Sequence, residues 1–176
     1  MKNSFLLAPA VLLLLSCGGN NDKRDDAGDA SQGVEASVHQ LPRYTRKDSL
    51  KVGAHVFTYE ILREASDSLP PAHDDQLGDT RDNIIRLRIG RDGQQLFQRT
   101  FTKAFFRSSM GDAFYKRSIL DGISFRGADA ARGLTFVFSV SEPDSDVSMP
   151  FAVTVSPDGA VSVQQETLDY VDEENE

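Results

Sequence analysis

The chain has 176 residues, of which 39% are hydrophobic and 26% charged, and its formal net charge is −8. This composition is typical of a globular protein with one domain and flanking tails. The single cysteine excludes an internal disulfide, and the net negative charge argues against a nucleic acid partner.

The first 16 residues have the pattern of a secretory signal. A basic lead, residues 1–4, precedes an apolar run of about 11 residues from Phe5 to Leu15, shorter than the ~20 residues of a membrane-spanning helix. The next two residues, Ser16 and Cys17, complete a pattern that resembles the lipobox of bacterial lipoproteins, where a small residue precedes an acylated cysteine. We therefore predict cleavage before Cys17 and lipidation of its sulfur. The alternative is an ordinary secretory signal with an incidental cysteine.

Lipid on Cys17 would place the mature protein on a membrane. Each acyl CH₂ buried in a bilayer contributes about 0.8 kcal/mol, so fatty chains such as palmitate form a firm anchor. The predicted location is the bacterial cell envelope, as an exported lipoprotein of the outer membrane. Acidic residues after the cysteine resemble an address for the outer surface of that membrane. Here they begin only at Asp22, so the periplasmic and surface sides both stay open.

Polar and apolar residues divide the chain after the signal, residues 1–16, into three parts. Residues 17–48 carry too few apolar groups to repay the entropy of ordering, so we predict a lipidated cysteine followed by a flexible tether. Residues 49–165 contain the periodic segments of a β-rich globular domain. Residues 166–176 hold six acidic residues and no basic one, which indicates a solvated acidic tail.

The first half of the domain contains two strand patterns. Residues 51–63 alternate between apolar and polar, and a change of parity at Val56-Phe57 predicts a β-bulge. Residues 83–89 alternate Ile and Leu with Arg, and residues 96–103 return after the Asp92-Gly93 turn. An Asp-Gly pair between two alternating runs predicts a β-hairpin.

The second half continues in the same way. Residues 111–117 suit one or two helical turns, and residues 119–126, 134–140 and 151–155 suit strands, the last followed by a turn and a return strand. About seven to eight short strands joined by hairpins predict an all-β fold with at most one short helix. An antiparallel β-sandwich and a small β-barrel are both consistent with this pattern, with the eleven phenylalanines filling the core.

Four strings across the domain carry a resemblance to a known family. They are RTFTKAFF, YKRSILDGISF, VFSVSEPDSD and SPDGAVSV. Together they resemble domain-of-unknown-function family 4738, a family of short lipoproteins from Bacteroidota, over roughly residues 52–165. The resemblance implies an exported, anchored, β-rich domain. It implies no activity, and it carries over no functional residue.

The sequence offers few groups for catalysis. Cys17 is consumed by lipid, and the Gly-x-Ser-x-Gly pattern of a nucleophile elbow is absent. Of the three histidines, His39 falls in the predicted tether, His55 in a strand and His73 in a loop. A Ser-His-Asp triad needs a histidine beside both a serine and an acid, which this placement does not favour. We therefore predict no catalytic residue.

An acidic loop offers oxygen ligands for a metal. It contains His73, Asp74, Asp75, Asp79 and Asp82, but not the Asp-x-Asp-x-Asp-Gly spacing of a dedicated calcium loop. A solvated acidic loop is the simpler interpretation, so we predict no metal site and no cofactor.

Two further features bear on binding. Residues 81–132 hold an excess of Lys and Arg, which either neutralises the acidic segments or forms a face for an anionic partner. Phe101, Phe105 and Phe106 are predicted core anchors with Lys103 and Arg107 at the rim, the alternative being the lining of a barrel mouth.

The resulting hypothesis is a monomeric, non-catalytic binding module. Its ligand would be a small apolar or anionic molecule or an envelope protein, and its binding residues are unknown. The alternative is an envelope hydrolase that uses carboxylates or a metal bound in the loop from Asp74 to Asp82.

Overall fold

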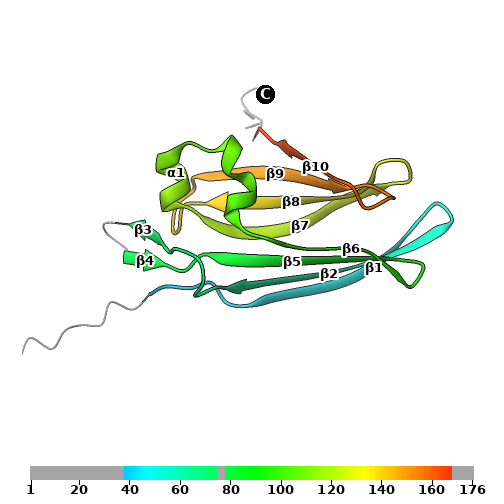
Figure 1. Ribbon diagram of the computed structural model, residues 1–176, viewed down its shortest axis with the longest axis horizontal. Coiled ribbons are helices and arrows are strands. Elements are labelled where there is room, and N and C mark those ends of the chain that lie inside the picture. Colours follow the sequence, from blue (N-terminus) through cyan, green and yellow to red (C-terminus); the bar gives the residue numbers. More distant parts are fainter. Residues whose placement is uncertain (1–37, 75–77, 168–176) are drawn as a thin grey trace, which may run out of the picture. The chain divides into compact units, whose positions relative to one another are not determined.

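The computed structural model describes residues 38–74 and 78–167, which form two antiparallel four-stranded sheets packed face to face (Figure 1). The first sheet has the order β1 (Tyr44–Val52), β2 (His55–Ala65), β5 (Asn83–Arg91) and β6 (Gln94–Phe101). The second has the order β10 (Val161–Gln165), β9 (Ser148–Val155), β8 (Gly133–Ser141) and β7 (Ile119–Asp129). Neither sheet closes on itself. The predicted all-β class is therefore confirmed, in the form of a sandwich.

Smaller elements occupy one end of the sandwich. β3 (Ala72–Asp74) and β4 (Gly78–Thr80) form a short hairpin between β2 and β5. A 3₁₀ helix, η1 (Lys103–Ser109), and an α-helix, α1 (Asp112–Arg117), connect β6 of the first sheet to β7 of the second. The structure thus has two short helices among its described residues where the sequence predicted at most one. None of the described helices is long and apolar enough to cross a membrane.

Alternating side chains explain why the longer strands form. In β5 the side chains of Ile85, Leu87 and Ile89 are fully buried, whereas Arg86 and Arg88 point outward. β8 follows the same rule, with four buried apolar residues alternating with half-exposed ones. Period-two alternation puts one face of each strand against the opposite sheet, which is the basis of the sandwich.

The first hairpin differs from the prediction. The change of parity near residue 56 comes from a two-residue turn at Gly53-Ala54, which separates β1 from β2, and the predicted bulge is wrong. Gly53 has a φ of +60°, which glycine adopts without steric cost. Residues 51–63 therefore belong to two paired strands.

Among the described residues, strand structure includes residues before position 49, the predicted start of the domain. β1 starts at Tyr44, and before it His39 forms a parallel bridge with Thr80, accepting from Arg81 N at 2.8 Å and donating to Asp79 O at 2.9 Å. β1 is an edge strand whose first six residues are exposed, so it carries little of the apolar periodicity that marks a strand. Residues 17–37 of the predicted tether and residues 168–176 of the tail lie outside the described residues.

Aromatic rings fill the space between the sheets. Tyr59, Phe101, Phe106, Phe136, Phe138 and Phe151 are among the largest fully buried side chains. The Phe106 and Phe151 rings stack at a centroid distance of 4.7 Å, which joins η1 to the second sheet. A core filled in this way confirms the predicted phenylalanine packing. The alternative, in which phenylalanines line the mouth of a barrel, does not apply to a sandwich of two open sheets.

A glycine at the start of β8 supports the packing of the second sheet. Gly133 has a φ of +97°, and a Cβ at this position would collide with the carbonyl oxygen of Val155 in β9. We expect Gly133→Ala to lower the free energy of unfolding by about 3 kcal/mol, because strain and a backbone clash add together.

The matched control is Gly122→Ala in the adjacent strand β7. A Cβ there meets nothing within 4 Å and φ is not positive, so the change should cost less than about 1 kcal/mol. Urea unfolding of both variants makes the comparison. Equal stability of the two would show that the close approach at Gly133 is not required.

Candidate functional site: a pocket at one end of the sandwich

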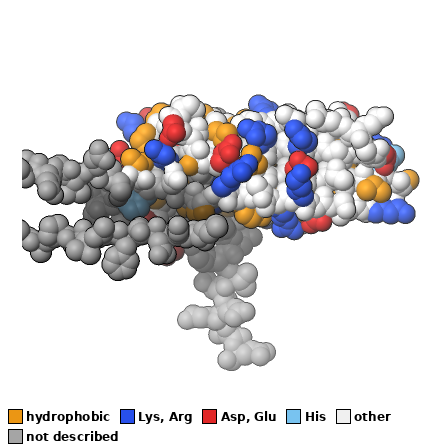
Figure 2. Space-filling model, turned by 90° about the horizontal axis from the view of Figure 1, so that it is seen from below, with side chains coloured by type: hydrophobic (Ala, Val, Ile, Leu, Met, Phe, Trp, Pro, Cys, Tyr) orange, Lys and Arg blue, Asp and Glu red, His pale blue; other side chains and the backbone are white. Residues whose placement is uncertain are grey.

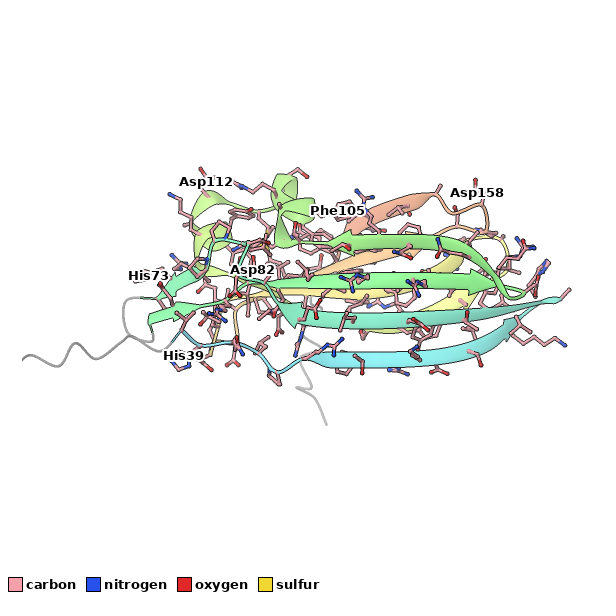
Figure 3. All side chains as sticks on the ribbon, turned by 60° about the horizontal axis from the view of Figure 1, so that its bottom comes forward. His39, His73, Asp82, Phe105, Asp112 and Asp158 are labelled. Carbon is pink, nitrogen blue, oxygen red and sulfur yellow. The ribbon has the colours of Figure 1, made fainter. Side chains whose placement is uncertain are left out.

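A pocket of about 300 Å³ lies where the segment before β3 meets η1 and α1. Its lining comes from four parts of the chain: Leu69, Pro70, Pro71, His73, Asp82, Thr102, Lys103, Ala104, Tyr115 and Lys116. Figure 3 shows Asp82 inward of His73 at the end of the sandwich that carries α1. We call this the end pocket.

Chain topology brings these residues together. β5 begins at Asn83 and β6 ends at Phe101. Because Ile85 pairs with Phe101, the same register continued past Phe101 puts residue 103 opposite residue 83, next to Asp82. The chain then crosses to the second sheet through η1 and α1, and α1 packs against β3. Proline at positions 70 and 71 keeps the opposite wall extended.

A buried ion pair forms the base of the pocket. Lys103 Nζ lies 3.4 Å from Asp82 Oδ2 and donates to Ser118 O at 2.5 Å. The two side chains are only 7% and 3% exposed. The ammonium also lies 4.8 Å from the centroid of the Tyr115 ring, within cation–π range. Each of these partners replaces part of the hydration that the ammonium loses on burial.

The Asp82 carboxylate is also held by the backbone of both sheets. Its Oδ1 accepts from Asn83 N at 2.8 Å and from Leu120 N of β7 at 2.7 Å. Burial raises the pKa of Asp82 above its ordinary value, although Lys103 and the two N–H groups act in the opposite direction. Beside it, Asn83 Nδ2 donates to Leu120 O at 3.0 Å, which completes a polar link between the sheets.

The walls of the pocket are mainly apolar. Leu69, Pro70, Pro71 and Ala104 face the space together with the ring of Tyr115, and a second ammonium, that of Lys116, is exposed on α1. Apolar walls with a few polar groups at fixed positions are the usual form of a small-molecule site. This arrangement suits a ligand with an apolar body and one anionic group.

Lys103 was predicted at the rim of the core, together with Arg107, and that position is wrong. Its side chain is buried because the chain turns into η1 immediately after Phe101, which directs it toward Asp82. Arg107 is half-buried, and its guanidinium lies 4.5 Å from the Tyr115 ring centroid. The hairpin register, continued past the end of β6, puts residue 103 opposite residue 83, and this was the signal that places Lys103 next to Asp82.

The remaining predicted residues do not assemble into one site. Cys17 and Asp75 lie outside the described residues. His55 Nδ1 is 2.6 Å from Asp92 Oδ2, and its Nε2 is 2.5 Å from Arg91 Nη2. His73 Nδ1 is 2.7 Å from Asp79 Oδ1, and His39 bridges β4 through its backbone. Within residues 38–74 and 78–167, no group of three or more His, Cys, Asp or Glu is placed to hold a metal ion.

The fold and the pocket together define a class: an antiparallel β-sandwich with a buried Asp–Lys pair beneath a pocket at one end. Residues 23–163 match the sequence model of the family described as "Domain of unknown function (DUF4738)", and the chain belongs to this family. The predicted resemblance is thereby confirmed. A search of curated proteins found no match.

The ion pair makes a prediction about stability and pH. A carboxyl group whose pKa is raised on folding contributes stability below its ordinary pKa, and this stability is lost as the pH rises through the raised value. Lys103→Met removes the cation that lowers the pKa of Asp82, so the pKa should rise further and the loss should grow toward neutral pH. We expect a cost of about 3 kcal/mol near pH 8 and a smaller one near pH 5.

The double variant Asp82→Asn with Lys103→Met is the control. It removes both charges while an amide oxygen can still accept from Leu120 N, so most of the stability at pH 8 should return and the added pH dependence should vanish. Urea unfolding at a series of pH values measures both effects. A loss in Lys103→Met that is the same at every pH would contradict this electrostatic coupling.

Proposed function

We propose that this protein is a non-catalytic binding module of the bacterial cell envelope. Its end pocket would hold a small molecule with an apolar body and an anionic group. The observation that carries the proposal is the buried Lys103 ammonium beneath apolar walls. Of its three N–H donors, Ser118 O and Asp82 engage two, and the third, beside the Tyr115 ring, would donate to a ligand oxygen.

The dimensions of the pocket support a ligand of modest size. A volume of about 300 Å³ is at the lower end of the range for small-molecule sites. It corresponds to roughly ten water volumes. A bicyclic aromatic acid or a short branched acid would match it. The Tyr115 ring and the two prolines offer flat apolar surfaces for the body of such a ligand.

Engaged side chains favour binding over hydrolysis. A hydrolase needs a carboxylate or histidine that exchanges protons with its substrate. Asp82 accepts two backbone N–H bonds and faces Lys103, and His55 is held between Asp92 and Arg91. These groups act as structural partners.

The end pocket can be tested with naphthalene-2-carboxylate and its neutral analogue naphthalene-2-methanol. We expect the acid to bind at least about 10-fold more tightly than the alcohol, because only the acid gains a charge-assisted contact with ammonium groups. Ala104→Trp, at an exposed position on the wall, should fill the pocket and abolish binding. Isothermal titration calorimetry measures both.

Ser108→Trp is the matched control, since it adds the same side chain to an exposed position of η1 outside the pocket lining. It should leave the affinity unchanged. The pocket assignment fails if the wild-type protein shows no saturable binding of the acid, or if Ala104→Trp binds it as well as Ser108→Trp does.

We also propose that Cys17 carries the lipid that attaches the module to the envelope. The support is the sequence Leu14-Leu15-Ser16-Cys17 after a short apolar run. The full-length precursor, made in bacteria fed an alkyne analogue of palmitate, should become labelled and sediment with membranes. Cys17→Ser should lose both properties, and Ser16→Ala, which keeps a small residue, should retain them. Equal labelling of Cys17→Ser would exclude this anchor.

A further inference from the structure

The outer face of the first sheet carries charged side chains in an ordered pattern. Figure 2 views the molecule from this side and shows blue Lys and Arg groups lying in bands with red carboxylates among them. Strand register explains the pattern, because residues of one parity in β1, β2 and β5 all point outward. This face lies apart from the end pocket and uses none of its residues.

Each carboxylate on this face is placed between two cations. Glu60 Oε1 is 2.7 Å from Lys47 Nζ, and its other oxygen is 3.7 Å from Arg88 Nη1. Glu64 is 3.5 Å from Arg43 Nε and 3.8 Å from Arg86 Nη2. Four cations thus meet two carboxylates, so the face keeps a positive excess in a chain whose formal net charge is −8.

A shallow groove of about 270 Å³ runs between these charged residues. We call it the charged trough and define it by Arg43, Lys47, Glu60, Leu62, Arg86 and Arg88. Leu62 provides a half-exposed apolar floor. The four basic side chains are 40% to 73% exposed, so they are open to a partner.

Stability does not require this arrangement. Ion pairs at such exposure contribute about 0 to 1 kcal/mol each, so the cations can exchange their intramolecular carboxylates for those of a partner at little cost. Lys47 holds the pKa of Glu60 below its ordinary value, so this carboxylate stays ionised and limits the positive charge on the face. Alternating positive and negative charges on a surface contribute more to the specificity of binding than to its affinity.

We propose that the charged trough docks an extended acidic segment of a protein partner. Arg86 and Arg88 are two residues apart on one strand, which puts them about 6.7 Å apart on the same face. This distance equals the spacing of alternate side chains in an extended polypeptide, so acidic residues at every second position match both guanidinium groups. An apolar side chain beside them would cover Leu62.

The two carboxylates favour a polypeptide over a phosphate-rich surface. A dense array of lipid phosphates would meet Glu60 in the trough and Glu64 beside it, and would be repelled by both carboxylates. A polypeptide can place a backbone N–H or a basic side chain opposite each carboxylate. The alternation of sign along the trough therefore selects a mixed, net acidic segment.

The test uses the full chain and two peptides of about ten residues with the same composition. One has glutamate at every second position, and the other has its glutamates in one block. We expect the alternating peptide to bind at least about 10-fold more tightly, with an affinity that falls as salt is added. Arg86→Glu with Arg88→Glu should weaken it by at least about 10-fold.

The matched control is Lys51→Glu with Arg132→Glu, the same change of charge at two exposed cations outside the trough lining. It should change the affinity less than about 2-fold, and unchanged thermal unfolding of both double variants shows that they are folded. Vesicles with about 30% phosphatidylglycerol test the lipid alternative.

Three outcomes would overturn the proposal: no binding of either peptide, equal binding of both, or equal losses in the two double variants. Vesicle binding that depends on Arg86 and Arg88, without peptide binding, would assign the face to a lipid surface instead. Binding of naphthalene-2-carboxylate to the double variant Arg86→Glu with Arg88→Glu tests the end pocket separately. Failure of the trough and failure of the pocket can therefore be distinguished.

Discussion

The carboxylate of Asp82 is the group that fixes how the two sheets meet. Apolar contacts between two sheets tolerate small sliding movements, whereas hydrogen bonds to one backbone N–H do not. Asp82 Oδ1 accepts from Leu120 N of the second sheet and from Asn83 N at the start of β5. Arg63 of β2 adds a second link by donating to Asp121 O at 2.5 Å. Both links lie near the start of β7, so the pocket-bearing end of the sandwich is the end where the sheets are held in register.

Holding a carboxylate in this position has an electrostatic cost, and the chain offsets it locally. Burial raises the pKa of Asp82, and Lys103 reduces the penalty by lying 3.4 Å away. A buried pair of this kind adds little net stability compared with an apolar replacement, but it fixes geometry, since neither charge can move without leaving the other unpaired. The end pocket is built over this pair, so its shape follows from the same constraint.

Local periodicity revealed much of this fold, and long-range pairing accounts for what it missed. The β5–β6 hairpin follows from alternating Ile, Leu and Arg around Asp92-Gly93, and β8 from alternating Leu, Phe and Val. Edge strand β1 has little such pattern because its first residues face solvent, so its residues 44–48 fall in the predicted tether. The burial of Lys103 depends on Asp82, 21 positions away along the chain. The residues next to Lys103 in the sequence do not distinguish this buried lysine from an exposed lysine at the end of a strand.

The end pocket and the charged trough depend on different parts of the fold, so substitutions in the two surfaces differ in their effect on stability. The end pocket depends on the crossing from β6 through η1 and α1 to β7, so changes in its floor also change sheet packing. The charged trough depends mainly on the register of β1, β2 and β5, which puts its charged groups on the outer face of the first sheet, exposed or half-buried. Its side chains can therefore be exchanged with small effects on stability. A sandwich built this way can keep the shape of its end pocket fixed while the charges on the outer face of its first sheet vary.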